Sequence, residues 1–423
     1  MKQLKKYTYP ALILCTTLVS LIFIPSLVKK ATVEPNRYPF VYYSTIAEEL
    51  CIVDYKNDTA AAIEVTGKVY RTQEEADSVL PILKYRQLMS DGLLPDSIKG
   101  KETSARTIRA ENVIYLFKAS AWQSPQPSLY IMYESMPVRV GLESPGDVFR
   151  LKDKIEFIDI KTNSIETEKS ALFQAALEKH GFAFPAQWCN GNMTTRKPYD
   201  EGYFVLDAQN QLFHMKMVNG RPYVKNTGIG KDINIQWFDM QEAGNRRYYG
   251  FIYDTAGAMY IIGYEDGTYH YQKLDIAPLN LATDDIMIMG NLFYWTVSVS
   301  TETGKVYYGL EKDSLNRLSE HFIPKTKDNW DQISQILFPF YIRLESPYTY
   351  WVYPEFIYTS HYAWLTNLIL ALAFFFLAKK RTSCNKTICS IWILLAGIAG
   401  LVACLLIPAP SKIKPTGKFL SKA

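Results

Sequence analysis

Three long apolar stretches without a charged residue bracket this chain of 423 residues and confine its polar part to the middle. They run from Tyr9 to Val28, from Tyr362 to Ala378 and from Ile388 to Ile407. About 17–25 apolar residues in a row can cross a bilayer as a helix. We therefore predict transmembrane helices at 9–28, 362–378 and 388–407, and one globular domain at 31–360.

The charged residues divide unevenly between these parts. Residues 1–30 and 361–423 together hold 13 of the 46 Lys and Arg residues and no Asp or Glu. The middle therefore keeps 46 − 13 = 33 basic residues and all 42 acidic ones, a net charge of −9. A nucleic-acid-binding protein needs a basic face, so this composition argues against a nucleic-acid partner.

Positive charge in short loops predicts the orientation in a membrane. The N-terminal segment 1–8 carries three lysines, and the loop 379–387 carries four basic residues. With three spans both lie on one side, which we predict to be cytoplasmic. The acidic domain is then periplasmic, and the protein lies in a bacterial inner membrane with an uncleaved first helix. The tail 408–423 would also lie outside, although its four lysines favour the cytoplasm.

Three segments of the domain look alike, and each reads as two strands around a tight turn: 203–217, 250–264 and 297–310. Their turn residues Asn210, Gly257 and Gly304 are 47 residues apart. A repeated meander of about 40–50 residues is typical of a β-propeller blade. We predict a mostly β domain of propeller-like antiparallel meanders with inserted helices. A large antiparallel sandwich is the alternative.

Helices are expected to interrupt the β pattern at 73–89, 169–180 and 328–337, and Pro81 is expected to kink or restart the first. Thr72 and Glu75 have the spacing of a capping box at the start of the first. The charged segment 99–111 has no clear periodicity and is predicted to be a loop. Cys51 and Cys189 are the only cysteines of the domain. They could form a disulfide or be two buried thiols.

A polar cluster is the best candidate for chemistry: Asp200, Glu201, His214 and His270. Adjacent carboxylates can perform acid–base catalysis or bind Ca²⁺, although most are solvated turn residues. Alternation along its strand predicts that His214 faces solvent. A hydrolase would need a pocket lined by several of these four residues and the pair Asp284–Asp285. The sequence matches no metal, phosphate or dinucleotide motif, so no cofactor is expected.

Small residues recur every four positions in the last apolar stretch, at Ala396, Gly400 and Cys404. This spacing allows close packing of helices in lipid. The partner would be the second span or a helix of another protein. The spans contain no Asp, Glu, Lys, Arg or His, and Asn367 is their only amide, so an ion pathway lacks its usual groups.

Several segments resemble an uncharacterised domain-of-unknown-function family of gut-bacterial membrane proteins: 155–163, 182–185, 197–203 and 212–216. The resemblance covers most of the chain. Members of that family look as if they are encoded beside ABC-transporter ATPases, which implies a membrane partner in export. The family has no catalytic residues to carry over.

These observations predict a membrane-anchored extracytoplasmic binding or accessory module of a membrane complex, with an ABC-type export system as the candidate partner. The alternative is a periplasmic hydrolase that uses a carboxylate or metal site in the β-rich domain. The sequence does not decide whether the protein is an enzyme and favours a module without catalysis.

Overall fold

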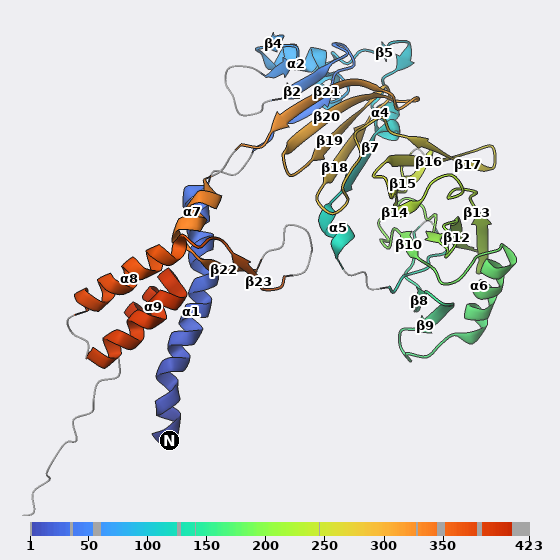
Figure 1. Ribbon diagram of the computed structural model, residues 1–423. Helices are drawn as coiled ribbons and strands as arrows, with labels where there is room; N and C mark the ends of the chain where they lie inside the picture. Colours follow the sequence, from blue (N-terminus) through green and yellow to red (C-terminus); the bar gives the residue numbers. More distant parts are fainter. Residues whose placement is uncertain are drawn as a thin grey trace, which may run out of the picture. The chain divides into compact units, whose positions relative to one another are not determined.

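The computed structural model divides the chain into two compact units, residues 38–325 and the terminal segments 1–37 and 326–423 together (Figure 1). It describes residues 2–33, 37–53, 61–124, 128–139, 141–244, 246–326, 329–344, 352–378 and 383–407. Residues 326–360, placed in the globular domain by the sequence, group with the terminal helices.

The larger unit consists mainly of antiparallel sheets whose strands follow one another in sequence order. The first sheet contains β1 (Phe40–Tyr43), β2 (Leu50–Val53), β3 (Ala62–Glu64) and β4 (Val69–Tyr70). The second contains β10 (Trp188–Gly191), β11 (Tyr203–Leu206), β12 (Leu212–Val218) and β13 (Arg221–Asn226). The third contains β14 (Ile235–Met240), β15 (Tyr248–Asp254), β16 (Met259–Glu265) and β17 (Thr268–Lys273).

A fourth sheet has five strands, because an earlier strand joins its edge. It contains β18 (Asp285–Gly290), β19 (Tyr294–Ser300), β20 (Gly304–Glu311), β21 (Arg317–Pro324) and, beside β18, β7 (Val113–Phe117). Two small hairpins pair β5 (Ser97–Ile98) with β6 (Lys101–Glu102) and β8 (Asp147–Leu151) with β9 (Ile155–Asp159).

The predicted repeat is confirmed as three equivalent hairpins, β11–β12, β15–β16 and β19–β20. Asn210 and Gly257 have φ of 60° and 82°, the left-handed region that Asn and Gly tolerate in tight turns. The prediction that Gly304 is the third turn residue was wrong, because Gly304 is the first residue of β20 and its φ is not positive. The turn before β13 likewise has positive φ at Asn219 and Gly220. The mostly β prediction is confirmed. None of the described sheets is closed.

The sheets pack face to face in a series, because alternate residues of the central strands enter different cores. In β11, Tyr203 and Val205 pack against β8, β9 and α6 (Thr167–Lys179). Phe204 and Leu206 point the other way, into a core shared with β14. The third sheet in turn shares a core with the fourth, through residues such as Tyr253. The second and third sheets are therefore buried on both faces.

The inserted helices partly follow the prediction. The Thr72–Glu75 capping box is confirmed at the start of α2 (Gln73–Val79), and the expected interruption at Pro81 separates α2 from a second helix, α3 (Tyr85–Ser90). The loop predicted at 99–111 was wrong. Its second half is α4 (Ala105–Glu111), whose first turn is capped by Ser104 Oγ accepting from Thr107 N. A short helix, α5 (Ala119–Gln123), follows β7.

The terminal unit is mainly helical. It contains α1 (Lys2–Thr32), α7 (Trp330–Leu337), β22 (Phe340–Arg343), β23 (Glu355–Tyr358), α8 (Ala363–Leu377) and α9 (Ser383–Leu406). Among the described residues, two helical segments are long and apolar enough to cross a membrane, Tyr7–Thr32 and Asn385–Leu406. A signal sequence near the N-terminus passes the same test. The segment 362–378, expected as the second of three spans, forms a helix of only 15 residues.

The last predicted span is not one straight helix. Gly397 has φ 60° and ψ −137°, so α9 is two helical pieces joined at that residue. Ala396 lies before the break and Gly400 and Cys404 after it, so the three residues do not form one face of a continuous helix. Gly400 and Cys404 are buried, and Cys404 contributes to a core formed by α1, α8 and α9. The tail 408–423 and residues 379–382 of the predicted loop lie outside the described residues, and residues 383–387 belong to α9.

Candidate ligand-binding site

A loop of eleven residues between β10 and β11, 192–202, carries the polar groups of the site. It ends at Gly202, whose φ is 66°. A Cβ at this position would lie 2.4 Å from the carbonyl oxygen of Met215 on β12. Only glycine permits so close an approach with this backbone. The turn places Asp200 and Glu201 against the second sheet.

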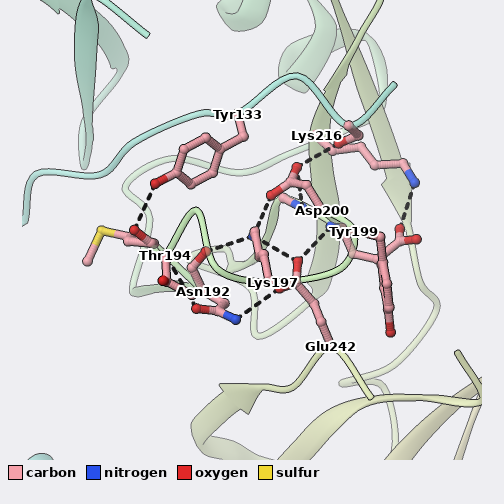
Figure 2. A network of polar contacts seen from close by, with 12 residues as sticks. Tyr133, Asn192, Thr194, Lys197, Tyr199, Asp200, Lys216 and Glu242 are labelled. Atoms are coloured by element: carbon pink, nitrogen blue, oxygen red, sulfur yellow. Dashed lines mark hydrogen bonds and ion pairs between the residues drawn. The ribbon is translucent and has the colours of Figure 1, made fainter. Parts of the chain in front are cut away.

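Lys197 is the centre of a buried ionic network (Figure 2). Its Nζ donates to Asp200 Oδ1 at 2.5 Å, to Glu242 Oε1 at 2.8 Å and to the carbonyl oxygen of Asn192 at 2.7 Å. All three charged side chains are at most 2% exposed. One ammonium group thus neutralises one of two buried carboxylates and holds both in place.

The two carboxylates have further donors. Asp200 Oδ2 accepts from Ser135 Oγ at 2.7 Å and from Gly202 N at 3.1 Å. Glu242 accepts from Glu201 N at 2.8 Å and from Asn192 Nδ2 at 3.0 Å. Burial raises the pKa of Glu242 above its usual range, against the lowering effect of Lys197. A buried polar network with its atoms satisfied rigidifies the segments that it joins.

His214, on β12, lies beside this network and is 1% exposed, so the prediction that it faces solvent was wrong. Its strand face is the one that the third sheet covers. The ring stacks on Phe204 with centroids 4.7 Å apart. Nε2 contacts the carbonyl oxygen of Glu201, which can only accept, so Nε2 carries the proton. Nδ1 then accepts from the Tyr269 hydroxyl at 2.6 Å.

Burial holds the His214 imidazole in its neutral form. Desolvation lowers its pKa from 6.5 to about 3, with smaller contributions from nearby lysines. Lys216 does not pair with the imidazole but with Glu201, at 2.6 Å. The carboxylate and the ammonium of that pair are both partly exposed.

These groups form one wall of a cavity of about 440 Å³. Its other walls are mainly tyrosines, contributed by the loop and by β13, β15, β16 and β17: Tyr199, Tyr223, Tyr249, Tyr264 and Tyr269. The volume lies in the range of about 300–1,000 Å³ typical of small-molecule sites. We call this cavity the tyrosine pocket.

The tyrosine pocket offers both ring faces and hydroxyls. The rings of Tyr249, Tyr264 and Tyr269 contact one another, with centroids 4.7–5.9 Å apart. Within the described residues, the hydroxyls of Tyr223, Tyr249 and Tyr264 make no hydrogen bond to protein. A ligand with apolar ring faces and several hydroxyl groups could therefore use the two properties together.

Arg246 supplies positive charge at the edge of the pocket. Its guanidinium lies over the Tyr199 ring, 4.3 Å from the centroid. The residue is exposed and has a φ of 57°, uncommon for a side chain other than Asn, Asp or Gly. Within the part of the chain that the structure describes, this guanidinium has no carboxylate within ion-pair distance. It is therefore available to an anionic group of a ligand.

The structure brings together three of the four residues of the predicted polar cluster. Asp200, Glu201 and His214 line the tyrosine pocket. His270 does not: it is exposed, neighbours Tyr269 on the opposite face of β17 and packs over Gly263. The pair Asp284–Asp285 lies elsewhere, where Asp284 accepts from Asn280 N and Asp285 from Ala119 N.

Sequence reasoning missed the residues that complete the site. Lys197 stands only three positions before Asp200, so its proximity was a usable signal, but Glu242 is 45 residues away. The five tyrosines follow no motif that would mark them as a group in the sequence. Tyr249 and Tyr264 lie on β15 and β16, which the repeat had located.

The carboxylates near the pocket are engaged in ion pairs, Asp200 and Glu242 with Lys197 and Glu201 with Lys216. Both nitrogens of His214 are also bonded. Groups held in this way form a rigid polar wall and do not resemble a poised general acid and base. No group of three or more His, Cys, Asp or Glu among the described side chains is placed to hold a metal ion.

A larger cavity, of about 720 Å³, lies along the β8–β9 hairpin. Two of the three basic residues that line it, Arg150 and Lys154, are paired with Glu156, at 2.6 and 2.7 Å, and Lys152 is the third. Cys189 borders it, and Cys51 lies in a different core. Both cysteines are free and buried, so the two-thiol alternative is confirmed. The tyrosine pocket remains the better candidate because unengaged hydroxyls and a guanidinium face it.

Comparison with known families supports a shared domain. A family model described as a domain of unknown function, DUF4857, matches residues 40–310. This range includes every residue of the tyrosine pocket and lies within the larger unit. It does not extend to the apolar helices. No curated protein matches the chain.

Proposed function

Because the chain belongs to the DUF4857 family of unknown function, we propose its role from the site itself: a membrane-anchored module that binds a ligand outside the cytoplasm through the tyrosine pocket. In this proposal α1 anchors the protein in a bacterial inner membrane and the larger unit lies in the periplasm. The module serves as an accessory part of a membrane complex, with an ABC-type exporter as the candidate partner.

The chemistry of the pocket favours an acidic saccharide. Tyrosine rings offer flat apolar surfaces to the CH faces of a sugar ring, and their hydroxyls can bond to its hydroxyls. Arg246 can pair with a carboxylate, in the planar geometry for which guanidinium is suited. The half-buried pair of Glu201 and Lys216 offers an acceptor and a donor. The observation that carries the proposal is this convergence of five tyrosines and one unpaired guanidinium.

The buried Lys197 network supports binding without forming the binding surface. It joins the 192–202 loop to Glu242, which follows β14, and so holds Tyr199 and the Glu201 backbone in position. A site held rigid before the ligand arrives loses less entropy on binding.

The test is calorimetric titration of the full chain in mild detergent with D-galacturonic and D-glucuronic acid, and with D-galactose and D-glucose as neutral probes. We expect binding of an acid, weakened at least tenfold by Tyr249→Ala. Arg246→Gln should remove the preference for the acid over its neutral counterpart. His270→Ala is the matched control, because it lies on the opposite face of β17, and should bind as the wild type does.

Two results would contradict the proposal. If the acidic sugars fail to bind, or bind equally well to Tyr249→Ala, the tyrosine pocket is not a saccharide site. If purification in mild detergent recovers this protein alone, the proposal that it is an accessory part of a complex is contradicted.

A further inference from the structure

We infer that α9 is a re-entrant hairpin, so that both of its ends, and the basic tail after it, lie on one side of the membrane. The inference rests on the membrane location proposed above. It concerns the path of the chain and does not depend on the ligand. It replaces the third crossing expected from the sequence with a loop of helix that enters and leaves by the same face.

The backbone of α9 reverses at Gly397. A Cβ placed on Gly400 would lie 3.0 Å from the carbonyl oxygen of Trp392 and 3.3 Å from the Cα of Ile393. In a continuous helix residues eight positions apart are separated by about 12 Å along the axis, at 1.5 Å per residue. The piece after Gly397 must therefore run back along the piece before it.

Asn367 of α8 occupies the break. It is fully buried, and its Nδ2 donates to the carbonyl oxygen of Leu394 at 3.0 Å. In a continuous helix that carbonyl would accept from residue 398, which lies beyond the reversal. The amide oxygen of Asn367 lies 2.4 Å from the position that a Cβ on Gly397 would occupy. The side chain thus replaces a lost helical bond, at a point where only glycine fits.

Neither piece of α9 is long enough to cross a bilayer. Residues 383–396 and 398–406 number 14 and 9. They extend for about 21 and 14 Å, against about 30 Å of hydrocarbon. Irregular backbone at membrane depth is tolerated where it is buried in protein. Here Ile393 and Ala403 enter a core with α8 and α1, and Trp392 Nε1 donates to Thr17 Oγ1 on α1 at 2.9 Å.

The distribution of positive charge favours the same conclusion. With three crossings, the N-terminal segment and the 379–387 loop place 3 + 4 = 7 basic residues inside, and Lys29, Lys30 and the tail place 2 + 4 = 6 outside. With the 17 residues 362–378, α8 and its two caps, as the second crossing and with a re-entrant α9, the counts become 3 + 4 + 4 = 11 inside and 2 outside. Positively charged residues near spans are enriched on the cytoplasmic side, so the hairpin removes the conflict posed by the tail.

The first test maps the sides of the membrane with protease-cleavable epitope tags on the full chain. One tag follows Gly67, an exposed turn of the larger unit, one lies in the 379–387 loop, and one follows residue 423. In intact spheroplasts we expect cleavage only at Gly67. Cleavage at the C-terminal tag, with the loop tag protected, would overturn the hairpin and leave the proposed function intact. Protection of the Gly67 tag would instead overturn the proposed location of the domain.

The second test examines the reversal directly, independent of orientation. Ile393→Cys and Gly400→Cys are combined, with native Cys15, Cys384, Cys389 and Cys404 replaced by Ser, and oxidised in the membrane. Residues seven positions apart in a straight helix are about 10 Å apart, too far for a disulfide.

We expect this pair to form an intrachain disulfide, seen as loss of maleimide labelling. The pair Leu365→Cys and Leu372→Cys, seven positions apart on the unbroken α8, is the matched control and should stay reduced. Equal labelling of both pairs after oxidation would show that α9 is straight and would refute the inference.

Discussion

Replacing Lys197 with methionine tests whether the buried network is held together by charge. Methionine has a similar length, so packing is largely kept while the ammonium group is lost. Asp200 would keep its bonds from Ser135 and Gly202 N, and Glu242 its bonds from Asn192 and Glu201 N. Two buried carboxylates would then share the site without a cation.

The expected loss of stability can be bounded. Removing one member of a buried ion pair typically costs about 3–5 kcal/mol. A buried carboxyl group can avoid the cost of an unpaired charge by binding a proton. For a Glu at pH 7, protonation costs about 1.36 × (7 − 4.3), or about 3.7 kcal/mol. We therefore expect Lys197→Met to lower the free energy of unfolding by about 3 kcal/mol at pH 7.

The sign of the pH dependence separates charge from packing. In the variant, Glu242 has a pKa raised further above its unfolded value, so the folded state keeps a proton that the unfolded state releases above about pH 4.3. Its stability relative to the wild type then rises as pH falls. At pH 5 the protonation cost is about 1.36 × 0.7, or about 1 kcal/mol.

The assay is thermal unfolding of the full chain in detergent, followed by tryptophan fluorescence of the larger unit. Its 325 − 38 + 1 = 288 residues imply an unfolding entropy of about 0.6 kcal/mol per kelvin. The midpoint should fall by about 5 °C at pH 7 and about 2 °C at pH 5, relative to wild type at the same pH. The matched control Lys154→Met removes an exposed member of an ion pair and should change the midpoint by about 1 °C or less.

A rescue variant completes the test. Lys197→Met combined with Glu242→Gln removes the excess carboxylate and should recover most of the loss at pH 7. An equal midpoint shift at both pH values, or a double variant no more stable than the single one, would refute the electrostatic reasoning.

Three further outcomes are expected. Because His214 is neutral when folded, the free energy of unfolding of the wild type should fall by about 2 kcal/mol between pH 7 and pH 5: the unfolded imidazole gains a proton below pH 6.5 and the folded one only near pH 3. The thermal midpoint of His214→Gln should fall less over this pH range, and an identical fall would refute the reasoning. Gly202→Ala places a Cβ against the carbonyl oxygen of Met215 and should lower the free energy of unfolding by more than about 2 kcal/mol. Gly267→Ala, at a similar φ but in open space, should lower it by about 1 kcal/mol in the same assay. Burial raises the pKa of the Cys51 thiol to about 12, so maleimide should modify it only after unfolding, and mass spectrometry would detect earlier labelling.

Features that depend on neighbouring residues were predictable. The tight turns at Asn210 and Gly257 and the capping box at Thr72 follow from the backbone preferences of a few adjacent residues. The apolar stretches likewise predicted helices, because composition over about 20 residues is a local property. α4 escaped detection because its helix depends on a cap at Ser104 and on the burial of Ile108, and not on a periodic pattern.

The candidate site depended on contacts between distant segments. Strand alternation correctly placed His214 on the face of Leu212, but only the packing of the third sheet onto the second turns that face into a core. Lys197 meets Glu242 because two loops converge at the edges of those sheets.

The same division applies to the helices. The apolar segments, the tight turns and the mostly β character of the large domain could be read from the amino-acid sequence, since each follows from local composition and backbone preference. The covered strand faces and the reversal of α9 at Gly397, where Asn367 of α8 donates to the carbonyl oxygen of Leu394, depend on the packing of distant segments. A one-dimensional pattern records the preferences of residues, whereas burial and pairing depend on partners far away in the chain.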